Sequence, residues 1–147
     1  MASTKVDFEG SRGSQLAARL DLPQGAPRAY AVFAHCFTCS MDSKAASCIA
    51  RALADGFGVL RFDFTGLGGS GGDFAHTHFS SNVDDLVAAC DWLRTQHGAP
   101  ALLLGTRWAA QRRWRRRTGC PTAWRSPRWG RLSTLRMWSS SSAARCN

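Results

Sequence analysis

The last part of this 147-residue chain lacks most of what a packed domain needs. Residues 106–147 contain no Asp, Glu, His or Lys, and no Val, Ile, Phe or Tyr. They hold eleven arginines, so their formal charge is +11, whereas residues 1–105 hold eight basic and ten acidic residues, 8 − 10 = −2. Without apolar periodicity this basic, Arg/Trp/Ser-rich tail predicts neither helix nor strand, and we expect it to be disordered or non-native. Residues 1–105 are the expected domain.

Other absences limit the class of protein and its cellular location. No apolar run reaches about 18 residues, so no membrane span is expected. The first residues lack the basic-then-apolar layout of a secretory signal, which leaves a cytoplasmic location as the expectation. The six cysteines are then expected to be reduced, buried thiols. Cys36 and Cys39 form a lone CxxC without a second ligand pair, so neither a metal nor a cofactor is expected. A redox role for the pair would need a helix N-terminus that lowers a thiol pKa.

Hydrophobic patterning predicts alternating strands and helices in residues 1–105. The expected strands are residues 5–9, 15–22, 29–34, 58–64 and 101–104. One helix is expected after a cap at Asp42 or Ser43 and before Gly56, and another from a capping box at Ser81 to Gly98. This order indicates an α/β fold, with a mainly parallel sheet and helices on both faces.

The glycine-rich segment after the fourth expected strand allows two interpretations. Residues 66–71 fit G-x-G-x-x-G, the pattern of a dinucleotide-binding loop. That site needs a helix directly after the loop and an acid at the end of the next strand. Residues 73–78 have no apolar helical face, and Asp84, Asp85 and Asp91 lie within an expected helix. Nucleotide binding by this loop is therefore the alternative interpretation.

Two segments carry a resemblance to the α/β-hydrolase family. Residues 63–70 (DFTGLGGS) resemble the family's D-x-x-G-x-G-x-S loop, and residues 29–37 (AYAVFAHCF) resemble its third strand and H-G-x oxyanion loop, with Cys36 in place of glycine. The resemblance covers about residues 5–105. It is closest to the N-terminal half of the serine aminopeptidase/esterase-like domain in hydrolase–OsmC-like fusion proteins.

The resemblance implies a role for four residues. The backbone N–H of Phe37 or Cys36 would belong to the oxyanion hole, which steadies the negative oxygen formed in acyl transfer. His35 would brace this loop rather than transfer protons, and Asp63 would fix the shape of the glycine-rich loop. Intact relatives would hydrolyse small-molecule esters or amides.

The nucleophile that this family needs is missing. After its next buried strand the family presents serine in a G-x-S-x-G turn, but this chain has Gly105-Thr106-Arg107. Arg107 occupies the nucleophile position, and a guanidinium has no lone pair with which to attack a carbonyl. The tail also offers neither the acid nor the late histidine of a triad. Whether the chain is an enzyme is therefore uncertain, and an inactive, truncated hydrolase is expected.

The genetic code suggests an origin for the tail. Restoring one base after the Gly105 codon permits the reading Gly-His-Ser-Leu-Gly-Gly-Ala, which places a serine at position 107. The same shift turns every later tryptophan into Leu, Val or Met, and every later CGN arginine into Ala, Ser, Pro or Thr. A frameshift after Gly105 is the resulting hypothesis, which sequencing the DNA around codon 105 would test.

The alternative function of the tail is nucleic-acid binding. Residues 112–117 combine arginines with a tryptophan, which suits phosphates and stacked bases. Charge alone produces affinity without sequence preference, and the tail contains no recognisable reading motif. No specific nucleic-acid partner is therefore expected.

Overall fold

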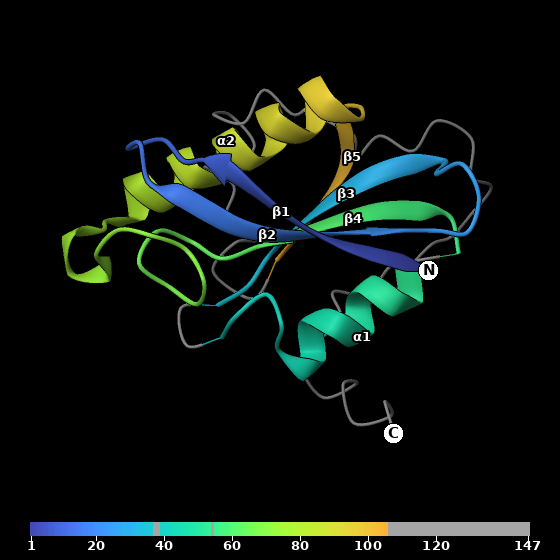
Figure 1. The fold of residues 1–147 in the computed structure, drawn as a ribbon, viewed down its shortest axis with the longest axis horizontal. Coiled ribbons are helices and arrows are strands. Elements are labelled where there is room, and N and C mark those ends of the chain that lie inside the picture. Colours follow the sequence, from blue (N-terminus) through green and yellow to red (C-terminus); the bar gives the residue numbers. More distant parts are fainter. Residues whose placement is uncertain (37–38, 54, 106–147) are drawn as a thin grey trace, which may run out of the picture.

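The computed structural model describes residues 1–36, 39–53 and 55–105 (Figure 1). The predicted tail, including Arg107, and the predicted oxyanion residue Phe37 lie outside the described residues. The elements are β1 (Ala2–Glu9), β2 (Gln15–Leu22), β3 (Ala29–Ala34), α1 (Lys44–Leu53), β4 (Phe57–Phe62), the short 3₁₀ helix η1 (Phe74–His76), α2 (Phe79–Gln96) and β5 (Pro100–Gly105).

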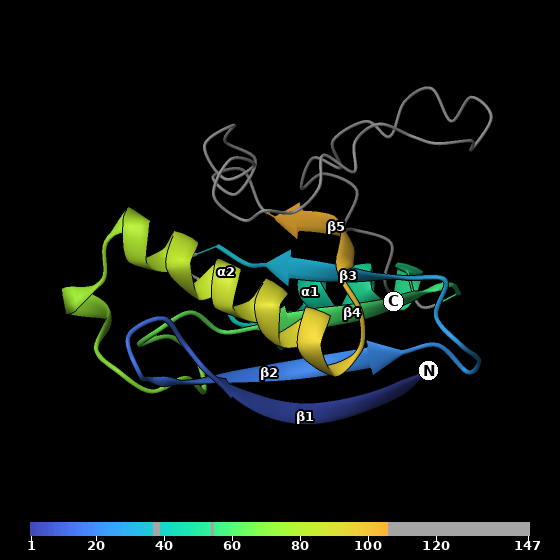
Figure 2. The ribbon, with the colours of Figure 1, turned by 90° about the horizontal axis from the view of Figure 1, so that it is seen from above.

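The described strands form one sheet in the order β1-β2-β4-β3-β5. β3 is parallel to both β4 and β5, while β2 is antiparallel to β1 and β4. Figure 2 shows this order from above, with the β1–β2 hairpin at one edge and β5 at the other. The α/β class is confirmed. Within the described residues β3, β4 and β5 form the parallel part of the sheet, and β2 adds an antiparallel pair with β1 and another with β4.

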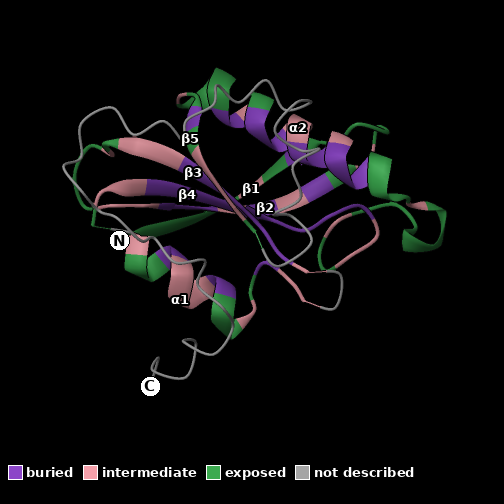
Figure 3. Ribbon diagram, turned by 180° about the vertical axis from the view of Figure 1, so that it is seen from behind, coloured by how far each residue is buried: buried purple, intermediate pink, exposed green. Residues whose placement is uncertain are grey.

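The two helices cover opposite faces of the sheet, as expected. α1 lies below the sheet and α2 above it in Figure 1. Alternate residues of the central strands contribute side chains to the cores on the two faces of the sheet, because successive side chains of a strand point to opposite faces. Val32 and Leu60 join the core cluster that contains α2, whereas Ala31 and Val59 join the one that contains α1. Figure 3 shows the buried residues concentrated on these central strands and on the sheet side of α2.

Local hydrogen bonds explain why some elements begin and end where they do. Ser43 Oγ accepts from the N–H of Ala46, so it caps α1, while Asp42 forms an ion pair with Arg19 instead. The predicted cap of α2 is wrong by three residues, since the N-cap is His78, and Ser81 lies inside the first turn, where its Oγ accepts the N–H of His78.

Candidate functional site

The carboxyl ends of β3, β4 and β5 meet at one edge of the sheet. Ala34, the last residue of β3, pairs with Phe62 of β4 on one side and with Gly105 of β5 on the other. The segments that follow β3 and β4 therefore begin side by side, next to the last described residue. Open α/β sheets bind ligands at this carboxyl edge.

His35 and Asp63 are the residues that directly follow the Ala34–Phe62 pair, and their side chains meet. The His35 Nε2 lies 3.0 Å from Asp63 Oδ1, and both side chains are almost completely buried, with 1% and 2% of their surface exposed. His35 Nδ1 lies 2.6 Å from the carbonyl oxygen of Cys36. An oxygen atom therefore lies close to each ring nitrogen of His35, on the Asp63 carboxylate and on the Cys36 carbonyl.

The Asp63 carboxylate also accepts two backbone N–H groups from different loops. Its Oδ1 accepts from Met41 at 2.6 Å, and its Oδ2 accepts from Gly69 at 3.0 Å. Burial raises the pKa of Asp63, but the hydrogen bonds from His35, Gly69 and Met41 outweigh burial, and the pKa lies below its ordinary value. Asp63 is therefore an ionised anchor that ties the segment after β3 to the glycine-rich loop.

A buried arginine holds the other side of the same peptide segment, and sequence reasoning gave it no role. Arg61 Nη1 donates to the carbonyl oxygen of Met41 at 2.6 Å, and its Nε donates to Asp21 Oδ2 at 2.7 Å. The Met41 N–H and C=O are thus both held by side chains of neighbouring β4-end residues, Asp63 and Arg61. The sequence signal for this role was a charged residue within an otherwise apolar strand. A buried arginine is rarely left without a partner, so such a residue indicates a buried polar contact.

The glycine-rich loop folds tightly against Asp63. Gly68 has a φ of +54°, and a Cβ at this position would lie 2.0 Å from Asp63 Oδ2. Ser70 Oγ donates to the carbonyl oxygen of Asp63 at 2.6 Å and accepts the N–H of Ala17 at 2.9 Å. Glycine at position 68 is thus required by close approach as well as by backbone conformation.

Several N–H groups of this loop donate to other groups of the protein. Gly66 donates to Gly71, Gly69 donates to Asp63, and Gly71 donates to Gln15. A phosphate-binding loop instead directs its N–H groups at the ligand from the start of a helix. The element that follows is the three-residue η1, so the geometry does not favour nucleotide binding.

The expectation of reduced thiols at Cys36 and Cys39 is wrong in this structure. The two residues form a disulfide, with their Cα atoms 5.3 Å apart. The physical reason is the hydrogen bond from the N–H of Cys39 to the carbonyl oxygen of Cys36, 3.0 Å long, which holds the two residues close together. Cys90, in contrast, is fully buried in the core, as expected of a packed thiol.

The predicted site residues therefore fall into two groups. His35, Cys36 and Asp63 come together at the carboxyl edge, whereas Phe37 and Arg107 lie outside the described residues. Within residues 1–36, 39–53 and 55–105, no group of three or more His, Cys, Asp or Glu side chains is placed to hold a metal ion. In the same ranges, no helix has the length and apolar character needed to cross a bilayer.

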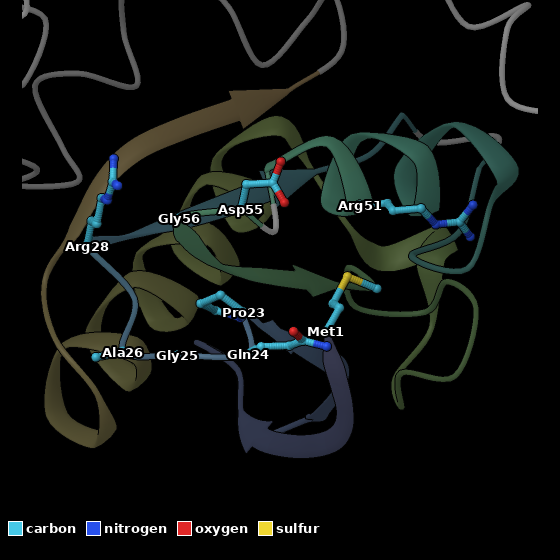
Figure 4. A pocket seen from close by; sticks show the side chains of 9 residues that line it. All are labelled: Met1, Pro23, Gln24, Gly25, Ala26, Arg28, Arg51, Asp55 and Gly56. Carbon is cyan, nitrogen blue, oxygen red and sulfur yellow. The ribbon is translucent and has the colours of Figure 1, made fainter.

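A surface pocket lies at the opposite end of the parallel strands, where β3 and β4 begin. It includes Arg28, which directly precedes β3, and Gly56, which directly precedes β4. Figure 4 shows that the side chains of Arg28 and Arg51 lie on opposite sides of the opening and do not converge. Binding sites usually have several polar groups aimed at one point, so the carboxyl edge is the better candidate.

Comparison with solved structures places the described fold among hydrolases. An esterase domain from Rhodothermus marinus is 50% identical, with a TM-score of 0.56 over 71% of this chain and 40% of that one. An esterase from Pyrococcus furiosus is 23% identical, with a TM-score of 0.60 over 71% and 40% of the two chains. The α/β hydrolase GrgF from Penicillium is 20% identical, with a TM-score of 0.63 over 71% and 37%.

These likenesses show the α/β-hydrolase fold, as the sequence resemblance predicted. This chain spans only about 40% of the length of the Rhodothermus and Pyrococcus proteins. No protein-family model and no curated protein matches it. The predicted OsmC-like fusion and the frameshift stay predictions.

Proposed function

We propose, from the premise of an α/β-hydrolase fold, that residues 1–105 are the oxyanion-stabilising half of a serine hydrolase that acts on small-molecule esters. We further propose that the chain as written is catalytically inactive. The observation that carries the proposal is the buried His35–Asp63 pair at the carboxyl edge, with Met41 and Gly69 N–H groups on the same carboxylate.

Acyl transfer explains why such an anchor would be useful. A carbonyl carbon under attack develops an oxyanion, which is stabilised best by N–H groups already fixed in place. Asp63 and Arg61 hold the Met41 peptide, and His35 contacts the Cys36 carbonyl, so the segment that would supply these N–H groups is tied down at two points. The backbone N–H of Cys36 or Phe37 is the proposed donor.

The sheet register supports the proposal. Gly105 pairs with Ala34, the residue directly before His35. A nucleophile two residues after Gly105 would therefore begin its turn next to the proposed oxyanion donors. In this chain that position is Arg107, which cannot form an acyl-enzyme, and the tail contains no acid or histidine to activate a hydroxyl.

A paired labelling experiment tests both parts of the proposal. The purified chain is treated with a fluorophosphonate probe and with p-nitrophenyl acetate, and we expect neither covalent labelling nor an acetyl-enzyme burst. The second sample is expressed from the gene with one base restored after codon 105. We expect this sample to be labelled at the new serine and to hydrolyse the ester.

A matched control is the frame-restored gene with that serine codon changed to alanine, which should abolish labelling. Labelling of the original chain would refute its inactivity. A folded, frame-restored protein that neither reacts with the probe nor hydrolyses the ester would refute the hydrolase proposal itself.

A further inference from the structure

β1 is an edge strand of the sheet. Within the part of the chain that the structure describes, it pairs with β2 and with no other strand, and Figure 2 shows it at the opposite edge from β5. We propose that β1 is the interface of a symmetric homodimer, in which it pairs antiparallel with β1 of a second copy around Val6. This proposal goes beyond the proposed hydrolase function and does not depend on it.

The outer side of β1 carries peptide groups of every second residue. In an antiparallel pair, residues alternate between those that bond to the neighbouring strand and those whose N–H and C=O point away from it. Ala17 lies opposite Asp7, and its N–H and C=O bond to Ser70 and Asp63, on the side of β2 away from β1. Asp7 is therefore also a residue whose peptide groups point away from the pair. By the same alternation the outward-directed residues of β1 are Ser3, Lys5, Asp7 and Glu9.

A two-fold axis at Val6 brings these outward groups together. If Val6 lies opposite Val6 of the second copy, Lys5 lies opposite Asp7 of that copy. In the same register Ser3 lies opposite Glu9. Each of these pairs consists of two outward-directed residues, so each can exchange two backbone hydrogen bonds. The two sheets would then continue into one another across the axis.

Side-chain charge favours this register over its neighbours. Lys5 and Asp7 are exposed, and neither takes part in an ion pair among the described residues. With Val6 at the axis, the dimer gains two cross-strand pairs of opposite charge, which stabilise a sheet. With Lys5 at the axis, two lysines would face each other. With Asp7 at the axis, Lys5 would face Glu9, but the two aspartates would face each other, and like charges directly opposite are destabilising.

The other face of β1 supplies apolar contacts. Phe8 is buried in the core cluster that contains α2, and the partly exposed Val6 packs against that cluster. At the axis, Val6 would contact Val6 of the second copy in a non-hydrogen-bonded pair, the kind in which facing side chains lie closer. Thr4 would lie opposite Phe8 on the same face. Pairing would thus cover the surface of Val6 that one copy leaves exposed.

A charge-swap series tests this interface. Sedimentation equilibrium of the full chain over the micromolar range should show a reversible equilibrium between monomer and dimer. Lys5→Asp would place two acids opposite each other, and Asp7→Lys would place two lysines there. Each variant should therefore raise the dissociation constant of the dimer by at least about tenfold. The double variant Lys5→Asp/Asp7→Lys restores opposite charges and should dimerise as the wild type does.

A mixture of the two single variants gives a sharper test. One chain then carries two acids at the facing positions and the other carries two lysines, so an equimolar mixture should form a heterodimer although each variant alone is weakened. Lys44→Asp is the matched control, because it makes the same change in net charge as Lys5→Asp at an exposed position of α1. It should leave dimerisation unchanged. Circular dichroism checks that every variant remains folded.

Amide hydrogen exchange locates the contact. The amides of Lys5 and Asp7 should exchange several-fold more slowly as the dimer forms, whereas those of Val6 and Phe8 face β2 and should be protected in both states. The proposal would be overturned by a chain that stays monomeric, by a dimer that both single variants retain, by a mixture that does not associate, or by protection confined to another element. These readouts do not measure catalysis, so they are distinct from the fluorophosphonate result that decides the hydrolase proposal.

Discussion

At the scale of single residues, Asp63 joins several parts of the candidate site. One buried carboxylate contacts His35 and accepts N–H groups from Met41 and Gly69, which belong to two different loops. Its lowered pKa means that the folded protein favours the ionised form. The ionised form adds stability above the ordinary pKa of 3.8, and this contribution is lost as the pH falls through the lower pKa of the folded state.

Replacing Asp63 by asparagine should remove this pH-dependent contribution. We expect Asp63→Asn to lower the free energy of unfolding at pH 7 by about 3 kcal/mol, because His35 loses its buried partner. The wild-type protein should also lose stability more steeply than the variant as the pH falls below about 4. Urea unfolding followed by circular dichroism across this pH range measures both effects.

A surface aspartate provides the comparison. Asp7 is exposed on β1, and Asp7→Asn should leave both the stability and its acid dependence close to those of the wild type. Equal acid dependence in wild type and Asp63→Asn would contradict the assigned role of the Asp63 charge.

Sequence reasoning singled out His35 and Asp63 but missed the groups that bind them. Both residues stood in segments with a family resemblance, whereas the Met41 peptide is held only because β3 and β4 are neighbours in space. Arg61 was visible as a charge within an apolar strand, but its partner Asp21 comes from an antiparallel strand far away in sequence. The expectation for Cys36 and Cys39 was wrong because it relied on the expected cellular compartment, whereas the disulfide depends on how close the two residues lie in the fold.

At the scale of elements, the glycine-rich loop is the most sharply constrained. Gly68→Ala would combine a positive φ with a Cβ 2.0 Å from Asp63 Oδ2, so the carboxylate or the loop has to move. We expect a loss of at least about 2 kcal/mol in unfolding free energy, since strain and a broken anchor add together. Thermal and chemical denaturation check this value.

Gly25→Ala is the matched control for this substitution. A Cβ at Gly25 would have nothing within 4 Å, and this glycine lies in the loop between β2 and β3. Its stability should stay within about 0.5 kcal/mol of the wild type, as at ordinary surface positions. If the two variants were equally stable, the close approach at Gly68 would not be a real constraint.

The predicted elements agree best where the apolar pattern is unambiguous. β2 and β3 have the bounds that the sequence predicted, because β2 alternates and β3 is a continuous apolar run. β1 begins three residues earlier than predicted. Its first residues are exposed and have no apolar pattern, but they pair with β2, beginning with Ala2 opposite Leu22. β4 ends at Phe62, where Asp63 turns to its loop partners, and η1 had no apolar pattern from which it could be predicted.

At the scale of the whole molecule, charge divides the chain at Gly105. The eleven arginines of residues 106–147 should give the full chain affinity for single-stranded nucleic acid that falls steeply with salt. Filter binding of two unrelated oligonucleotides at about 50 mM and 200 mM salt should show a loss of at least about 100-fold for both. A clear sequence preference that persists at the higher salt would instead support an evolved nucleic-acid function.

The pairing of Gly105 with Ala34 has an evolutionary consequence. Ladder contacts are made by the backbone, so the point at which the chain leaves β5 is the same whatever side chains come next. A new sequence that followed β5 would therefore begin beside the segments after β3 and β4, whose contacts with Asp63 and Arg61 are already formed. A mutation that rewrites everything downstream can therefore erase a reaction in one step while sparing its scaffold, and an equally small reversal could restore it.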